Sequence, residues 1–130
     1  MNRHALRAKL ERNGLKKYAD KHFTDETSPV VNELKLEGKD AVIGIQTKDG
    51  AYTVLGEKFV YYLTPLGVKG QIPLGVFSDE LHENGMSKGK LLARYKYLKL
   101  KNGHRIWLKN KSTMCALWNT LLWFESLSDG

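Results

Sequence analysis

The last third of the chain has the clearest pattern of apolar and polar positions. From Ser112 to Leu127, apolar side chains recur at steps of three and four residues, which predicts one amphipathic helix with a broad buried face. Ser112 is of a residue type that commonly caps a first helical turn, so we expect the helix to begin there. The predicted buried face holds Met114, Leu117, Trp118, Leu121, Leu122 and Phe124.

The segment before this helix predicts a β-hairpin, because short apolar runs flank the pair Asn102-Gly103. A two-residue turn at this pair would place Leu100 opposite Arg105 and Leu98 opposite Trp107. Both faces of the hairpin would then carry apolar side chains. This is typical of a sheet that curls around a core.

The middle of the chain changes from a helical to an extended pattern. Residues 30–36 fit a helix or a strand, and residues 76–82 fit a further strand or one helical turn. Residues 85–89 predict a mobile loop, because glycine brackets small polar residues there. Runs rich in β-branched and aromatic residues predict strands at 41–47, 52–55, 58–64 and 68–74.

A basic helix is predicted at the N-terminus, over residues 5–21. Its apolar face is narrow, formed by Leu6, Leu10 and Tyr18, and Gly14 interrupts it. We therefore expect an appended helix that contacts a partner or a second copy of the chain, and whose deletion leaves the rest folded. The predicted organisation is a basic helix, a polar connector and a β-rich domain with the C-terminal helix, at residues 1–22, 23–29 and 30–130.

Composition places the chain in the ordinary globular class. Its 130 residues fit one domain, 42% of them are hydrophobic, and no run approaches the roughly 18 apolar residues of a membrane span. The N-terminus lacks the apolar segment of a secretory signal. The single cysteine, Cys115, cannot form an internal disulfide, and we expect a small buried side chain there. These features predict a cytoplasmic protein.

Charge is distributed unevenly along the chain. The net charge of +7 arises because residues 1–22 carry +5 and residues 58–111 carry +8, while residues 23–57 between them carry −4. Such asymmetry favours an acidic protein partner or another anionic surface. The candidate contacts on the N-terminal helix are Arg3, Arg7, Arg12, Lys16 and Lys17. The candidate binding residues of the second basic segment are Lys88, Lys90, Arg94, Lys96, Lys99, Lys101, Arg105, Trp107 and Lys109.

Nucleic acid is the alternative ligand for the second basic segment. Its cations alternate with Tyr95, Tyr97 and Trp107, and cations can meet phosphates while aromatic rings stack on bases. The same composition also fits a half-buried hairpin, whose aromatic side chains face the core and whose lysines discourage edge pairing.

A small enzyme or toxin is the third alternative. On a helix, Asp79, His82 and Glu83 would share one face, as acid–base or metal-binding groups can. The sequence holds no zinc, nucleophile-elbow or phosphate-loop motif that would extend this cluster. We therefore expect no enzymatic activity, no cofactor and no metal.

The order of these elements resembles the pleckstrin-homology-like barrels of small bacterial proteins. The likeness covers residues 40–127 and rests on an aromatic strand at 57–63, a strand ending in Pro73-Leu74, the Lys-Asn-Gly-His hairpin and the Arg-Ile-Trp-Leu strand before a single helix. The resemblance implies that this helix plugs one open end of the barrel. It also implies a binding module. The expected fold is thus α+β, a strongly bent antiparallel sheet or such a barrel capped by the C-terminal helix, with an added N-terminal basic helix.

Overall fold

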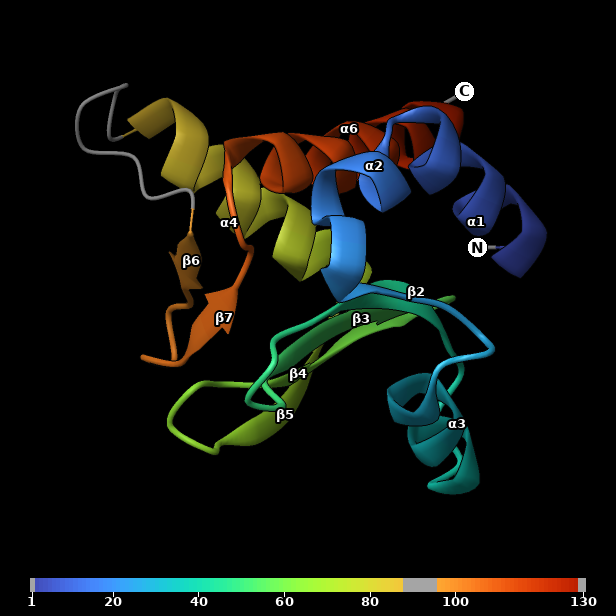
Figure 1. Ribbon diagram of the computed structural model, residues 1–130. Helices are drawn as coiled ribbons and strands as arrows, with labels where there is room; N and C mark the ends of the chain where they lie inside the picture. The colour runs from blue at the N-terminus through green and yellow to red at the C-terminus, as the bar shows by residue number, and fades with distance from the viewer. Residues whose placement is uncertain (1, 88–95, 129–130) are drawn as a thin grey trace.

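The structure is a computed structural model that describes residues 2–87 and 96–128. An antiparallel sheet lies between two layers of helices: α1, α2, α4 and α6 on one side and α3 on the other (Figure 1). The order of the strands follows the order of the chain. It runs β1 (Phe23–Thr24), β2 (Ala41–Gln46), β3 (Tyr52–Gly56), β4 (Phe59–Leu63) and β5 (Lys69–Pro73).

This arrangement confirms the α+β class, the antiparallel sheet and the C-terminal helix. Each predicted strand is present, and all neighbours pair antiparallel. The sheet is open, with β1 and β5 at its edges, so the strands of the described residues do not close a barrel.

The helical segments resolve what the pattern left open. Residues 30–36 and residues 76–82 are both helical. Of the predicted loop at 85–89, the first three residues belong to α4 and the last two lie outside the described residues. The helices are α1 (Arg3–Arg12), α2 (Leu15–Ala19), the 3-10 turn η1 (Asp20–His22), α3 (Pro29–Leu36), α4 (Leu74–Ser87) and α6 (Lys111–Ser128).

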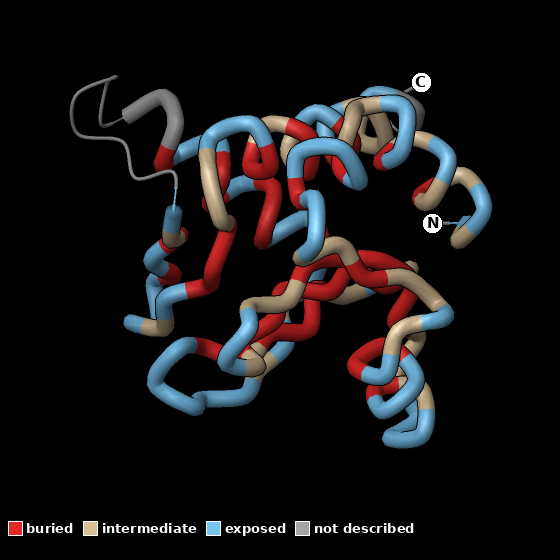
Figure 2. Tube along the Cα trace, viewed as in Figure 1, coloured by how far each residue is buried: buried red, intermediate tan, exposed pale blue. Residues whose placement is uncertain are grey.

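The central strands are buried on both faces, as Figure 2 shows. Ile43, Leu55 and Val60 are paired neighbours, so they share one face, where they join the main core beneath the helical layer. Val54 and Tyr61 lie on the other face and form a second cluster with α3. Each face of the sheet therefore has its own cover.

The N-terminal helix belongs to the main core, contrary to the appended helix that we predicted. Leu6, Leu10, Leu15 and Ala19 are all 0% exposed in the main cluster, whereas Tyr18 is 39% exposed. The reason is a break at residue 14, where the backbone turns left-handed (φ 89°) and starts a second helix. The break rotates the apolar face, so that the first and last residues of α2 point inward.

Further contacts fix this helical pair to the C-terminal helix. Asn13 Nδ2 donates to Thr120 Oγ1 at 2.8 Å, and the Lys9 ammonium lies 4.8 Å from the centre of the Trp123 ring. The predicted connector is also partly structured, because Phe23–Thr24 forms the edge strand β1. The helices α1 and α2 and the sheet thus share one hydrophobic core.

The hairpin forms, but the predicted register was wrong by one residue. In β6 (Tyr97–Lys99) and β7 (Arg105–Trp107), Tyr97 pairs with Trp107 and Lys99 with Arg105. The turn has three residues instead of two, and its last residue, Gly103, is left-handed with φ 90°. Such a turn adds a bulge that shifts the pairing.

The shift changes which residues pair across the hairpin. Leu98 and Ile106 now pair, and together with Leu100 and Leu108 they are buried in the main core. A one-residue slip moves every side chain to the opposite face of a strand. The opposite face also carries apolar side chains, because Trp107 is 6% exposed in the main core and its partner Tyr97 packs against that core. Apolar side chains on both faces are therefore confirmed, although the predicted pairing was wrong.

The C-terminal helix was predicted correctly in extent but not in its cap or its packing partner. Asn110 caps it, since its Oδ1 accepts the N–H of Thr113 at 2.9 Å, and Ser112 is exposed in the first turn. Leu122, expected in the buried face, is exposed, and Cys115 is only half-buried. α6 packs on α4, α2 and α1, so it covers those helices and does not plug an end of the sheet.

A buried tyrosine ties the second face of the sheet to the loop before β2. The Tyr61 hydroxyl donates to Asp40 Oδ1, and Asp40 Oδ2 accepts the N–H of Glu57 at 3.0 Å. Burial, followed by this bond, raises the pKa of Tyr61 to about 12.

Tyr61 should make the fold sensitive to alkali. Its folded pKa lies above the ordinary value of 10.0, so its contribution to stability is complete below pH 10 and is lost between pH 10 and about 12. The free energy of unfolding, measured by urea denaturation at several pH values, should fall over this range. Tyr61→Phe should reduce that fall. An identical pH dependence in the variant would contradict the assignment.

Leu10→Ala tests the role of α1 in the core. Because Leu10 is fully buried, the change should lower the free energy of unfolding by about 2–5 kcal/mol in urea denaturation. Leu36→Ala is the matched control, since Leu36 is 88% exposed, and it should change stability by less than about 0.5 kcal/mol. If the two changes lowered the free energy of unfolding equally, α1 would not be part of the core and would be an appended helix.

Candidate anion-binding face

The two predicted basic segments meet where α2 and η1 adjoin the hairpin. Lys109 Nζ donates to the Tyr18 carbonyl at 2.8 Å, and the His22 ring lies edge-on to the Trp107 ring, 5.4 Å between centres. The carbonyl of Lys96 accepts the N–H of the residue before Lys109 at 2.7 Å. The contact between Lys109 and Tyr18 joins residues 91 positions apart in the sequence.

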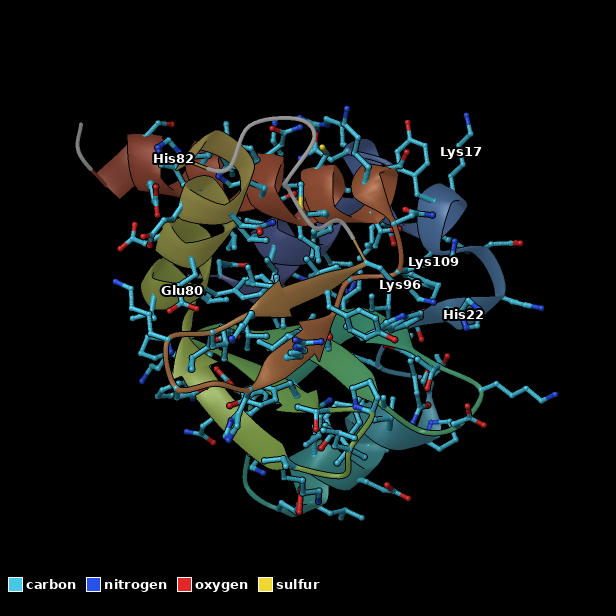
Figure 3. All side chains as sticks on the ribbon, turned by 90° about the vertical axis from the view of Figure 1, so that its left-hand side faces the viewer. Lys17, His22, Glu80, His82, Lys96 and Lys109 are labelled. Carbon is cyan, nitrogen blue, oxygen red and sulfur yellow. The ribbon has the colours of Figure 1, made fainter. Side chains whose placement is uncertain are left out.

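Four cations at this junction form what we call the basic face: Lys16, Lys17, Lys96 and Lys109. Lys17, Lys96 and Lys109 lie on the same side of the hairpin, with His22 nearby (Figure 3). Lys16, Lys17 and Lys96 are exposed, and the described residues supply no ion pair to them. Lys109 is half-buried and satisfies the carbonyl end of α2, where a positive charge is favoured.

Backbone strain is concentrated at the same junction. Within the described residues, the non-glycine positions with positive φ are Asp20 (53°) and Lys109 (71°). The Asn110 N–H donates to the Leu108 carbonyl across Lys109, which makes a tight three-residue turn of the strained kind. Such conformations cost on the order of 1–3 kcal/mol and cluster at functional sites, so they direct attention to this face.

The predicted contacts of the N-terminal helix divide into two groups. Arg3 and Arg7 both pair with Glu26, and Arg3 Nε also lies 3.1 Å from Glu57 Oε1. These two arginines are therefore engaged within the chain. Arg12 is exposed at the end of α1, and only Lys16 and Lys17 of this group join the basic face.

The candidate residues of the second segment also divide. Lys88, Lys90 and Arg94 lie outside the described residues. Lys99, Lys101 and Arg105 are exposed along the hairpin. Lys101 Nζ reaches Glu83 Oε2 at 3.9 Å.

Trp107 is not available as a stacking surface. Its side chain is 6% exposed, its carbonyl accepts the Thr53 hydroxyl at 2.6 Å, and His22 contacts its ring. Tyr97 beside it is half-buried against the main core. Sequence reasoning missed His22 and the Tyr18 carbonyl, because neither carries a signal before the segments are brought together.

The acidic cluster of α4 lies on the other side of the hairpin from the basic face. Asp79, His82 and Glu83 are exposed, and the His82 ring lies 5.7 Å from the Trp118 ring. In residues 2–87 and 96–128, no three histidine, cysteine or acidic side chains are grouped to hold a metal ion. This geometry adds no support to the hypothesis that the chain is a small enzyme or toxin.

Two carboxyl groups of the acidic segment, those of Asp25 and Glu37, have lowered pKa values. Hydrogen bonds from Thr27 lower the pKa of Asp25, and the charges of Lys16 and Arg7 lower it further. A hydrogen bond from Lys69 lowers the pKa of Glu37. The charged form of Asp25 is thus favoured mainly by Thr27, and that of Glu37 mainly by Lys69.

No helix in the described part of the chain is long and apolar enough to cross a bilayer. Comparisons with models of protein families, with curated proteins and with solved structures gave no match to this chain.

Glu26→Gln tests whether Arg3 and Arg7 are engaged internally. Removing the carboxylate charge leaves the cations of α1 and Lys35 close together, so the free energy of unfolding should fall by about 1 kcal/mol at low salt and by less at high salt. Glu33→Gln, an exposed change on α3, is the control and should have no comparable effect. No difference between the two variants would mean that Glu26 does not hold these arginines.

Proposed function

We propose that this chain is a non-enzymatic interaction module of the cytoplasm that binds an acidic segment of a partner protein through the basic face. The contact between Lys109 and the Tyr18 carbonyl carries this proposal, because it joins cations of two distant segments. Grouped, unpaired cations attract an acidic segment and orient its approach. The resemblance to pleckstrin-homology-like barrels, itself a proposal, also favours a binding module.

A protein partner fits this face better than nucleic acid. Binding of single strands relies on exposed aromatic rings on which bases stack. Here Trp107 is buried and Tyr97 is half-buried, so neither offers a fully exposed ring. Tyr18 at the junction is 39% exposed, and Tyr95 lies outside the described residues. Contact of the N-terminal helix with a second copy of the chain remains a prediction of the sequence.

The internal pairing of Arg3 and Arg7 sharpens the proposal. Glu26 engages these two side chains, so the remaining positive charge of the N-terminal region includes Lys16 and Lys17, next to the hairpin. An acidic segment would therefore meet α2 and the hairpin together. The outer side of α1 would contribute little.

Single charge reversals test the basic face. Lys17→Glu and Lys96→Glu should each weaken binding of a fluorescent, glutamate-rich peptide about fivefold at about 50 mM salt, measured by fluorescence anisotropy. Lys58→Glu is the matched control. Lys58 is exposed in the turn between β3 and β4, whereas the basic face adjoins the Gln46 end of β2, and Gln46 pairs with Tyr52 at the opposite end of β3. The control should change affinity less than about twofold.

Two outcomes would overturn this proposal. If Lys58→Glu weakens binding as much as the other two changes, the attraction comes from net charge and not from a face. If an oligonucleotide of equal charge binds more tightly than the peptide, and the reversals flatten its salt dependence, the nucleic-acid alternative replaces it.

A further inference from the structure

A cavity of about 500 Å³ opens where η1, β1 and the turn after β2 meet the start of α3. Its lining includes two cations, Lys21 and Lys48, and three hydroxyl side chains, Thr24, Ser28 and Thr47. No carboxylate contributes to its lining within the described residues. The cavity is therefore positive and rich in hydrogen-bond donors.

The hydroxyl groups of Thr24 and Thr47 are the most informative part of this cavity. Thr24 is 5% exposed, and the Oγ1 atoms of both residues are buried without a hydrogen-bond partner among the described residues. A buried hydroxyl without a partner lowers the stability of the fold. Both Oγ1 atoms lie just behind the cavity wall, so a ligand with several acceptor oxygens would satisfy them once the threonine side chains rotate toward it.

The start of α3 adds positive potential at the same place. Ser28 precedes the helix, but its Oγ accepts the N–H of Asp25 at 3.0 Å and does not cap the helix. Pro29 occupies the first helical position and has no N–H. The first free N–H groups of α3 are thus left without a side-chain cap, and such an end favours an anion.

The nearby carboxylate of Asp25 already accepts hydrogen bonds from within the chain. Asp25 Oδ1 accepts both the N–H and the hydroxyl of Thr27, at 2.9 and 2.6 Å. It lies outside the lining of the cavity. Lys21 and Lys48 are exposed, and the described residues contain no ion pair to either.

We propose that this cavity binds the phosphate group of a phosphomonoester. A phosphate carries up to two negative charges and three acceptor oxygens, which matches two ammonium groups, two hydroxyls and a helix start. A carboxylate has only two oxygens and one charge. The cavity adjoins the basic face at His22 and Gln46, but none of the four lysines of that face lines it, so variants of Thr24, Lys21 and Lys48 test the cavity on its own.

Thr24→Val is the decisive variant, since valine keeps the shape and removes the hydroxyl. Dissociation constants for inorganic phosphate should be measured on the full chain by ¹H–¹⁵N NMR. The change should weaken binding about tenfold, as expected for a hydrogen bond to a charged group. Its melting temperature should stay the same or rise, because the lost hydroxyl had no partner. Thr113→Val is the matched control, because Thr113 Oγ1 is also buried and unpartnered but does not line this cavity.

Three further comparisons complete the test. The amide signals of residues 21–30 and 46–48 should move with phosphate and with O-phosphoserine, but not with serine. Glutamate at equal concentration should bind less tightly. Lys21→Gln and Lys48→Gln should each weaken phosphate binding, whereas Lys17→Glu on the basic face should leave these signals responsive.

The proposal is overturned if Thr24→Val and Thr113→Val bind phosphate equally, because the hydroxyl would then not contact the ligand. It is also overturned if phosphate moves only signals of the basic face, which would indicate general attraction to lysines. Failure of the acidic peptide to bind would not affect this result. Conversely, a cavity that binds no phosphate leaves the basic face to be judged on its own.

Discussion

β2, β3 and β4 are buried along both of their faces, so this sheet needs a cover on each side. A strand buried on both faces loses the alternation that would otherwise distinguish inside from outside. The short helix α3 covers one face with few residues, whereas the other face requires α1, α2, α4, α6 and the hairpin together. The N-terminal helix is in the core because the larger face would be open without it.

This requirement has an electrostatic consequence. Once α1 is packed inward through Leu6 and Leu10, its outer arginines come close to the acidic segment that contains Glu26. The charges of residues 1–22 and 23–57, opposite along the sequence, therefore partly neutralise each other in space. Among the described residues, the cations left without an ion pair include those at the end of α2 and on the hairpin. The position of the basic face follows from the packing of the core.

The sequence was most informative where one residue type has one structural meaning. The β-branched and aromatic runs predicted the strands, and the three- and four-residue spacing predicted α6. The sequence-based predictions failed where a single residue changed the orientation of a helix or the pairing of two strands. Gly14 turned the apolar face of α2 from Tyr18 to Leu15, and the extra residue before Gly103 slipped the hairpin by one position. Asn110 replaced Ser112 as the cap because the chain turns at Lys109, a conformation that no local pattern announces.

The candidate sites could be predicted only in part for the same physical reason. Basic residues of both segments were evident, but which of them are free depends on contacts such as those of Arg3 and Lys109. The cavity at Thr24 carries no sequence signal, because a threonine in an edge strand is ordinary. Its unpartnered hydroxyl becomes informative only when β1, η1 and the start of α3 are seen around it. In this chain the candidate binding residues lie at junctions between segments, where strained residues, unpaired cations or unsatisfied hydroxyls are brought together by the fold.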